Sequence, residues 1–305
     1  MKLARFWTRQ PGEATDRSGQ RVRVTSRGWS NESPDAAAVV AREIARKVAE
    51  RVAAGEPKAR QYGYGDRPLP EPVIQELRDE SGSASAVITR NVYGALVMNA
   101  RDLMFVDIDR EGSAAPAAGP DIVQDVAKEL ISGLSSLFGK TKPAGPPMPV
   151  QQPLTADPVV TEIHRVAERN NLALRIYKTA AGYRALIFNM RFDPASSQSE
   201  ALLREFGSDA LYMRLCKMQE SFRARLTPKP WRMGMSQPPV SFPFEGSNDE
   251  ARFYEWVAKY TASSAGYATC RFIGGFGAGS IEAGFPALIA YHDQETKATS
   301  GLRLA

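Results

Sequence analysis

The sequence is poor in the two residue types that most often hold transition metals. Its 305 residues include only two cysteines, Cys216 and Cys270, and only two histidines, His164 and His292. Each pair is widely separated along the chain, which excludes a disulfide framework, a cysteine-rich zinc site and a short-spaced histidine motif. Any metal site is therefore expected to use carboxylates, the ligands that suit Mg²⁺ or Mn²⁺.

Long apolar runs are also missing. No stretch approaches the ~20 residues that span a bilayer. The first residues, Met1–Trp7, lead directly into charge rather than into the apolar core of a signal peptide. We therefore expect a cytoplasmic protein with no membrane association. A hydrophobic fraction of 43% is ample for a buried core and, at this length, favours two domains.

Charge is distributed unevenly along the chain. Residues 1–60 hold 13 lysines and arginines against 7 aspartates and glutamates, and residues 165–232 hold 13 against 6, although the net charge is only +5. Most of the acidic excess falls between residues 61 and 164. Basic segments of this kind attract phosphate backbones. The alternative is that they form solvated faces that balance the acidic segment.

The first 60 residues predict a small basic β-β-α unit. Strands are expected over residues 4–9 and 20–27, and charged and apolar residues alternate from Arg21 to Val24, so that one face is charged and the other apolar. A helix is expected to begin near Pro34 and to end at Gly55. Its predicted apolar stripe consists of Val39, Val40, Ile44, Val48 and Val52.

Residues 61–305 predict a larger α+β domain with a flexible insertion at about 111–157, rich in Gly, Ala, Ser and Pro. The insertion holds one amphipathic stretch, Ile122–Phe138. Before it, we expect a turn-rich connector at 62–72, a short helix at Val73–Leu77, and strands at 85–91, 95–99 and 103–109. After it, we expect helices at 158–170, 199–206, 209–226 and 249–263, strands at 172–179 and 184–189, and a closing hairpin of 267–273 and 285–292.

The clearest candidate for chemistry is the pair Asp107 and Asp109 at the end of an apolar strand. Residues i and i+2 of a strand point the same way, so both carboxylates are expected on one face. Clustered carboxylates repel each other and are stabilised by a divalent cation, which activates a hydroxyl and neutralises a leaving pyrophosphate. The alternative is that the two aspartates simply end the strand and pair with Arg101 or Arg110.

A set of basic residues provides candidates for phosphate binding. Arginine is favoured for bidentate phosphate contacts. Trp231, which lies among these residues, is expected either to stack on a base or to anchor the core between prolines. Pairing with acidic residues competes with phosphate binding throughout this set. Its members are Lys178, Arg184, Arg223, Arg225, Lys229 and Arg232.

The order of these elements resembles the RRM-like palm of archaeo-eukaryotic primases and primase-polymerases. Asp107 and Asp109 match the acidic pair that ends the first palm strand, and the segment from Thr179 to Arg184 matches the small-residue turn and basic strand that follow. The resemblance covers about residues 95–190 and implies an RRM-like palm with an antiparallel or mixed sheet. It also implies a third acidic residue on a later strand, for which Asp293 is the candidate.

Arg184 stands where that family has a histidine that contacts the incoming nucleotide. A second likeness involves the string Phe222–Arg232, which resembles that of an uncharacterised bacterial protein family and implies no activity.

Three hypotheses for function follow from these patterns. The first is a metal-dependent nucleotidyl- or phosphoryl-transfer protein that acts on nucleic acid, with Asp107, Asp109 and Asp293 as catalytic residues and Mg²⁺ or Mn²⁺ on the first two. The second is a non-catalytic nucleic-acid- or partner-binding protein on a degenerate palm. The third is a structural or accessory protein whose Asp–Arg network is internal. The sequence leaves open which of the three holds, and therefore whether the protein is an enzyme.

Overall fold

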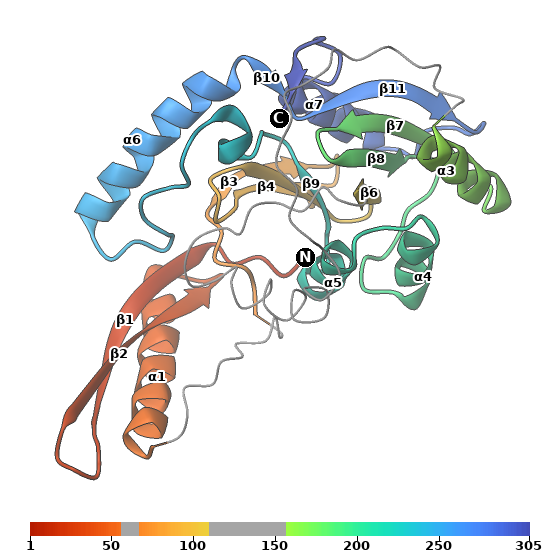
Figure 1. The fold of residues 1–305 in the computed structure, drawn as a ribbon. Coiled ribbons are helices and arrows are strands. Elements are labelled where there is room, and N and C mark those ends of the chain that lie inside the picture. The colour runs from red at the N-terminus through yellow and green to blue at the C-terminus, as the bar shows by residue number, and fades with distance from the viewer. Residues whose placement is uncertain (56–66, 110–156) are drawn as a thin grey trace, which may run out of the picture.

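The structure is a computed structural model that describes residues 1–55, 67–109 and 157–305. These residues form an α+β fold with an N-terminal β-β-α unit and two four-stranded antiparallel sheets (Figure 1). The predicted insertion, with its stretch Ile122–Phe138, lies outside the described residues, as does the first part of the predicted connector. No helix in the described parts of the chain is both long enough and apolar enough to cross a bilayer.

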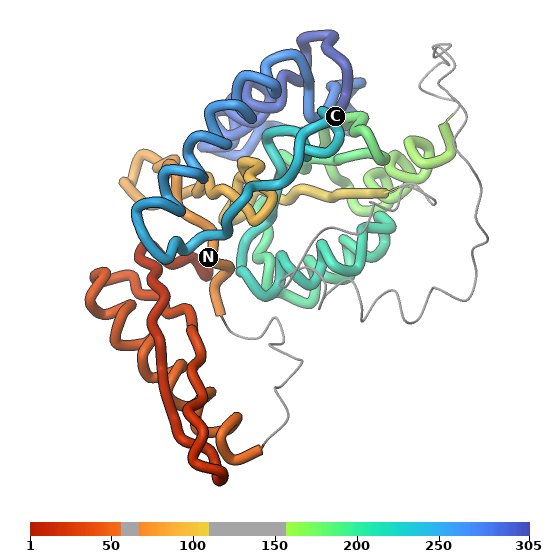
Figure 2. The backbone as a smooth tube through the Cα atoms, turned by 60° about the vertical axis from the view of Figure 1, so that its left-hand side comes forward, coloured from red at the N-terminus to blue at the C-terminus, as the bar shows by residue number. Residues whose placement is uncertain are grey.

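The N-terminal unit has the predicted β-β-α order, with longer strands. β1 (Phe6–Thr15) and β2 (Arg21–Ser30) form an antiparallel hairpin, and α1 (Pro34–Ala53) packs against it. The side chain of Ser33 accepts a hydrogen bond from the backbone N–H of Ala36, which caps the helix. The unit extends away from the two four-stranded sheets (Figures 1 and 2).

The buried face of α1 differs from the predicted stripe. It consists of alanines, whereas Val39 is 58% exposed. The cause is the close approach of helix and hairpin. A Cβ at Gly12 would lie 2.4 Å from the backbone carbonyl carbon of Ala45, and a Cβ at Gly28 would lie 2.3 Å from the backbone of Ala41. Only small residues fit on the helix face that meets these glycines, and they are Ala37, Ala41, Ala45 and Ala49.

The first of the larger sheets, which we call the β9 sheet, has the order β3-β4-β5-β9. Its strands are β3 (Val73–Arg78), β4 (Ala84–Arg90), β5 (Leu96–Ala100) and β9 (Phe222–Arg225). The second, the β6 sheet, has the order β11-β7-β8-β6. Its strands are β6 (Phe105–Asp109), β7 (Leu174–Thr179), β8 (Gly182–Ile187) and β11 (Cys270–Phe276).

Helices and short elements surround the sheets. The helices are α3 (Pro158–Arg169), α4 (Ser197–Glu205), α5 (Ala210–Gln219), α6 (Ser247–Ser264) and α7 (Phe285–Thr296). A 3-10 turn, η2 (Pro230–Met233), follows β9. Near the end of the chain, β10 (Tyr267–Ala268) and β12 (Arg303–Leu304) pair in parallel. The predictions for α3, α4 and α6, and for β4, β5 and β6, are confirmed to within a few residues.

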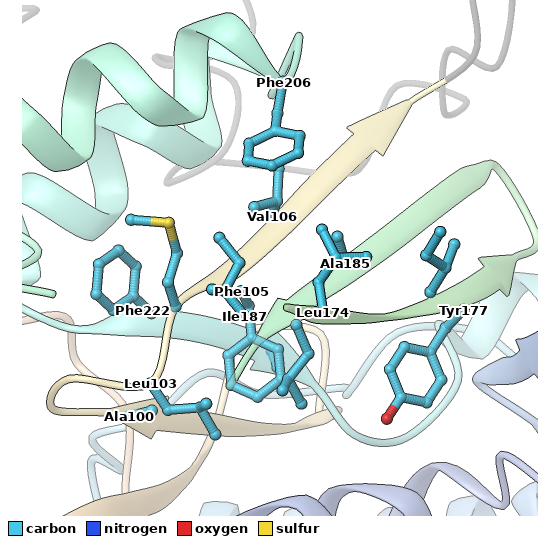
Figure 3. Packing of buried hydrophobic residues seen from close by; sticks show 14 of the residues in the cluster. Ala100, Leu103, Phe105, Val106, Leu174, Tyr177, Ala185, Ile187, Phe206 and Phe222 are labelled. Atoms are coloured by element: carbon cyan, nitrogen blue, oxygen red, sulfur yellow. The ribbon is translucent and has the colours of Figure 1, made fainter. Parts of the chain in front are cut away.

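One hydrophobic core joins the two sheets. Figure 3 shows Phe206, which follows α4, lying over Val106 of β6. Phe105 points to the opposite side of the same strand because side chains alternate. On that side its ring lies 5.3 Å from the ring of His292 on α7, so α7 covers this face of the β6 sheet. The two faces of β6 therefore belong to different layers.

One predicted helix is wrong and another was predicted too long. Val73–Leu77 is strand β3. The predicted helix 209–226 ends at Gln219, because Glu220 adopts a left-handed conformation with φ 49°, and the chain continues as β9. β9 pairs with β5, so that Phe222 and Ala224 face the core. The apolar residues Phe222 and Leu226 continued the helical spacing of the preceding residues, but Phe222 and Ala224 also have the alternate spacing of a strand.

The predicted closing hairpin is also wrong in its second half. Residues 285–292 belong to helix α7, with Gly284 in the left-handed region before it and Pro286 in its first turn. Its buried positions recur at helical spacing, namely Phe285, Leu288, Ile289, His292 and Thr296. Asp293 consequently lies within a helix and does not follow a strand.

Candidate functional site

Asp107 is engaged by a buried arginine from the neighbouring strand. The antiparallel register of β6 and β8 places Asp107 directly opposite Arg184. Arg184 donates from Nε to one carboxylate oxygen at 2.8 Å and from Nη2 to the other at 3.3 Å. The Arg184 side chain is 1% exposed and that of Asp107 is 34% exposed. The predicted alternative of a structural pair therefore holds for Asp107, but with Arg184 in place of Arg101, which pairs with Asp79.

Arg184 also joins the two sheets. Its Nη1 donates to the backbone carbonyl of Arg225 on β9 at 3.0 Å and lies 3.4 Å from Nε2 of His292. Burial opposes the charge of this guanidinium, but the Asp107 carboxylate prevails and raises the pKa of Arg184. These contacts are those of a structural residue that is held permanently charged.

Arg184 and His292 lie between Asp293 and Asp107. The carboxylate of Asp293 accepts from Arg175 at 2.6 Å and from the Tyr177 hydroxyl at 2.7 Å, and it lies 3.0 Å from Nδ1 of His292. Burial raises the pKa of Asp293, but hydrogen bonds from His292 and Tyr177 outweigh it, so the net shift is downward. The structure thus does not bring Asp293 together with Asp107 and Asp109 as one group of free carboxylates.

The side chain of Asp109, in contrast, has no hydrogen bond or ion pair within the described part of the chain, and it is partly exposed to solvent at the end of β6. Burial of the carboxylate, the charge of Asp107 and that of Asp209 raise the pKa of Asp109, while Lys229 and Arg232 act in the opposite direction. The strand end therefore carries one free carboxylate beside positive charge.

The positive charge comes from the segment after β9. Burial, followed by the charges of Arg225 and Arg232, lowers the pKa of Lys229 to about 8. Burial and the charges of Arg184 and Arg232 lower the pKa of Arg225 to about 10. Burial also lowers the pKa of Arg232, against the charge of Asp109. We call Arg225, Lys229 and Arg232 the cationic cluster.

No carboxylate of the described residues forms an ion pair with the cationic cluster. Among the described residues, no carboxylate oxygen lies within 4 Å of a side-chain nitrogen of Arg225, Lys229 or Arg232. Nη1 of Arg232 is buried and has no hydrogen-bond acceptor. Nζ of Lys229 lies 5.5 Å from the centre of the Trp231 ring, whose edge-to-face contact with Tyr93 fixes it in place. Trp231 is thus packed against Tyr93 but is only half-buried, and it is not part of the hydrophobic core.

The other predicted phosphate ligands are placed elsewhere. Lys178 is exposed on β7. Arg223 is buried, and its two Nη atoms donate to Asn99 at 2.6 Å and to Glu71 at 2.8 Å. Glu71 in turn accepts from the hydroxyl of Thr89. Sequence reasoning missed this network because it required β9 to be recognised as a strand beside β5.

A pocket of about 300 Å³ opens over this network. Its lining combines the charged pair Glu71 and Arg223 with aromatic rings, and Lys229 of the cationic cluster also borders it. Arg90, which also lines the pocket, has a pKa lowered by burial and donates to the carbonyl of Gly94. The aromatic lining residues are Tyr93, Phe242 and Phe253.

The described residues contain no group of three or more His, Cys, Asp or Glu side chains arranged to hold a metal ion. With both oxygens of Asp107 on Arg184, a divalent cation shared by Asp107 and Asp109 would have to compete with that guanidinium. The donor set therefore does not fit the two-carboxylate site that the palm resemblance implies. Comparison of the chain with protein-family models, curated proteins and solved structures finds no match in any of the three.

Proposed function

We propose that this protein binds the phosphate groups of a nucleic acid or nucleotide through the cationic cluster and does so without catalysing a reaction. The observation that carries the proposal is the set of three partly buried cations for which the described residues supply no carboxylate partner, and one of these cations has a buried nitrogen with no acceptor among those residues. Buried charge is costly unless it is paired. A bound phosphate supplies both the negative charge and the acceptor oxygens that the cluster lacks.

The neighbouring pocket supports a nucleotide unit as the ligand. Its volume of about 300 Å³ lies at the lower end of the range for small-molecule sites. Lys229 belongs to the cationic cluster and also lines the pocket. A phosphate bound to the cluster would therefore place an attached base or sugar near the aromatic lining of the pocket. Aromatic side chains of this kind stack on bases without strong sequence preference.

Replacing Lys229 and Arg232 together by glutamine is expected to weaken binding of a fluorescein-labelled 20-nucleotide single strand by about 10- to 100-fold near 0.1 M salt, since each phosphate contact on a single strand contributes about 0.7 to the salt slope. Fluorescence anisotropy measures the change, with inorganic phosphate as a competitor. The matched control is Arg204→Gln with Lys217→Gln, which removes two exposed cations that pair with Glu200. Equal affinity of the two double variants would refute the proposal.

The pH dependence provides a second check on the same titration. Lys229 is protonated below its pKa of about 8 and loses its charge above it. Affinity is therefore expected to be full at pH 7 and to fall by up to about tenfold by pH 9. Lys229→Arg keeps the charge over this range, so this variant is expected to retain affinity at both values. A wild-type affinity that is flat from pH 7 to 9 would exclude Lys229 as a phosphate ligand.

A second candidate is the metal-dependent nucleotidyl or phosphoryl transfer suggested by the sequence, with Mg²⁺ or Mn²⁺ as its cofactor. It is favoured by the free carboxylate of Asp109, whose pKa is raised by burial and by Asp107. Under this candidate, Mg²⁺ or Mn²⁺ raises the melting temperature of the wild type and not that of Asp109→Asn. Asp109 is the residue to change because replacing Asp107 would also leave Arg184 without its partner. An equal response of both proteins would exclude Asp109 as a metal ligand.

A further inference from the structure

The N-terminal hairpin has two distinct faces. Gly12 and Gly28 meet the backbone of α1, so residues of the same parity along each strand face the helix. The residues between them face away from it. On β2 these outward positions include Arg21, Arg23 and Arg27. The sequence alternation of charged and apolar residues is thus converted into a helix-covered face and a cationic face, which we call the ribbon face.

The arginines of the ribbon face differ in whether a carboxylate of the described residues pairs with them. Arg23 has Glu13 at 3.5 Å, and both side chains are mostly exposed. In the described part of the chain, Arg21 and Arg27 have no carboxylate within 4 Å. At about 3.3 Å per residue, Arg21 and Arg23 lie roughly 6.6 Å apart along β2, and Arg23 and Arg27 roughly 13 Å apart with Thr25 between them, which places three positive charges on one side of the strand.

At the base of the ribbon face two arginines lie directly opposite each other. Arg9 on β1 pairs in register with Arg27 on β2. Burial, together with the charge of Arg9, lowers the pKa of Arg27 to about 10. Arg9 reaches Glu245 and Ser241, but its Nε is buried and has no acceptor. Like charges opposite each other destabilise a sheet, and since Glu245 pairs with Arg9 and not with Arg27, an anion beside Arg27 would lower the cost that remains.

We propose that the ribbon face binds double-stranded DNA, with Arg21, Arg23 and Arg27 on its phosphates. The inference rests on the proposed function, because it takes the ligand proposed there and assigns its strandedness. The hairpin extends away from the body of the protein with its turn at the far end (Figures 1 and 2). A two-stranded ribbon of this kind fits the major groove of a duplex, and arginine suits phosphate and guanine contacts.

The test compares two triple variants with the same loss of charge. Arg21→Gln with Arg23→Gln and Arg27→Gln removes the row, whereas Arg42→Gln with Arg46→Gln and Lys47→Gln removes exposed cations of α1, two of which pair with Glu43. For a labelled 20-base-pair duplex near 0.1 M salt, the ribbon variant is expected to lose affinity about 100-fold and to have a salt slope shallower by about 2.7, for three phosphate contacts. The α1 variant is expected to remain within a few-fold of the wild type. Melting temperatures check that both variants fold.

A single-stranded 20-mer distinguishes this inference from the proposed function. The ribbon variant is expected to bind the single strand as the wild type does, while Lys229→Gln with Arg232→Gln loses it. If the two triple variants bind duplex equally, the ribbon inference is overturned and the cationic cluster is unaffected. If the wild type does not bind the single strand but the ribbon variant still has a lower affinity for duplex than the wild type, the proposed function fails and the ribbon inference stands. A further outcome would also overturn the inference. If polyglutamate at equal charge concentration displaces the labelled duplex as strongly as unlabelled duplex does, the partner is an acidic polypeptide.

Discussion

Replacing Arg184 by methionine is expected to lower the free energy of unfolding by about 3 kcal/mol, the lower end of the range for breaking a buried ion pair. The substitution removes both hydrogen bonds to Asp107 and the donor to the Arg225 carbonyl that joins the two sheets. The lower end applies because a third of the Asp107 side chain is exposed and water partly solvates the carboxylate. Urea unfolding followed by circular dichroism measures the change.

Arg204→Met is the matched control for this substitution. Arg204 forms an exposed i,i+4 pair with Glu200, for which a loss of only about 0.3–0.5 kcal/mol is expected. The result bears directly on function. If Arg184→Met leaves stability unchanged and abolishes nucleotide binding instead, Arg184 is a ligand-binding residue, and its role as a structural link between the sheets is wrong.

Replacing Arg223 by methionine is expected to lower the free energy of unfolding by about 3–5 kcal/mol, at least as much as the loss of Arg184. The side chains of Arg223 and Glu71 are 9% and 7% exposed, so the substitution leaves a buried carboxylate without its cation. Asn99 also loses the donor to its carbonyl oxygen. Unfolding in urea again measures the difference.

The second substitution Glu71→Gln tests the cause. It removes the stranded negative charge while keeping an oxygen that accepts from Thr89. The double variant is therefore expected to be more stable than Arg223→Met alone, because the penalty arises from the unpaired charge. If the double variant loses as much as the sum of the two single variants, the two side chains do not interact energetically and the cost has another source. Both expected results follow from the ion pair of Arg223 with Glu71, and neither depends on phosphate binding by Arg223.

Several elements could be predicted from local pattern alone. The alternation from Arg21 to Val24 predicted a strand with one charged face, and Ser33-Pro34 predicted the start of α1. The i and i+2 spacing of Asp107 and Asp109 predicted that both point to one side of β6. These predictions hold because side-chain direction within a strand, and capping at a helix start, depend on neighbours in the chain.

Helix α7 shows a signal that was present and was misinterpreted. Its buried residues recur at intervals of three and four from Phe285 to Thr296, which is a helical period. The segment contains β-forming residues and follows a glycine-rich stretch, which favoured a strand. That error also placed Asp293 among the candidate catalytic residues, whereas the helix directs it to Arg175 and Tyr177.

The sequence by itself determined the α+β class, the N-terminal β-β-α unit and which residues carry charge. Tertiary structure decided which of those charges meet. Phe222–Arg225 became a strand because β5 offers an edge to pair with after Glu220 ends α5. The same long-range pairing of β6 with β8 put Arg184 opposite Asp107 and left Asp109 free. Register between distant strands depends on packing of the whole core, so no local pattern specifies it.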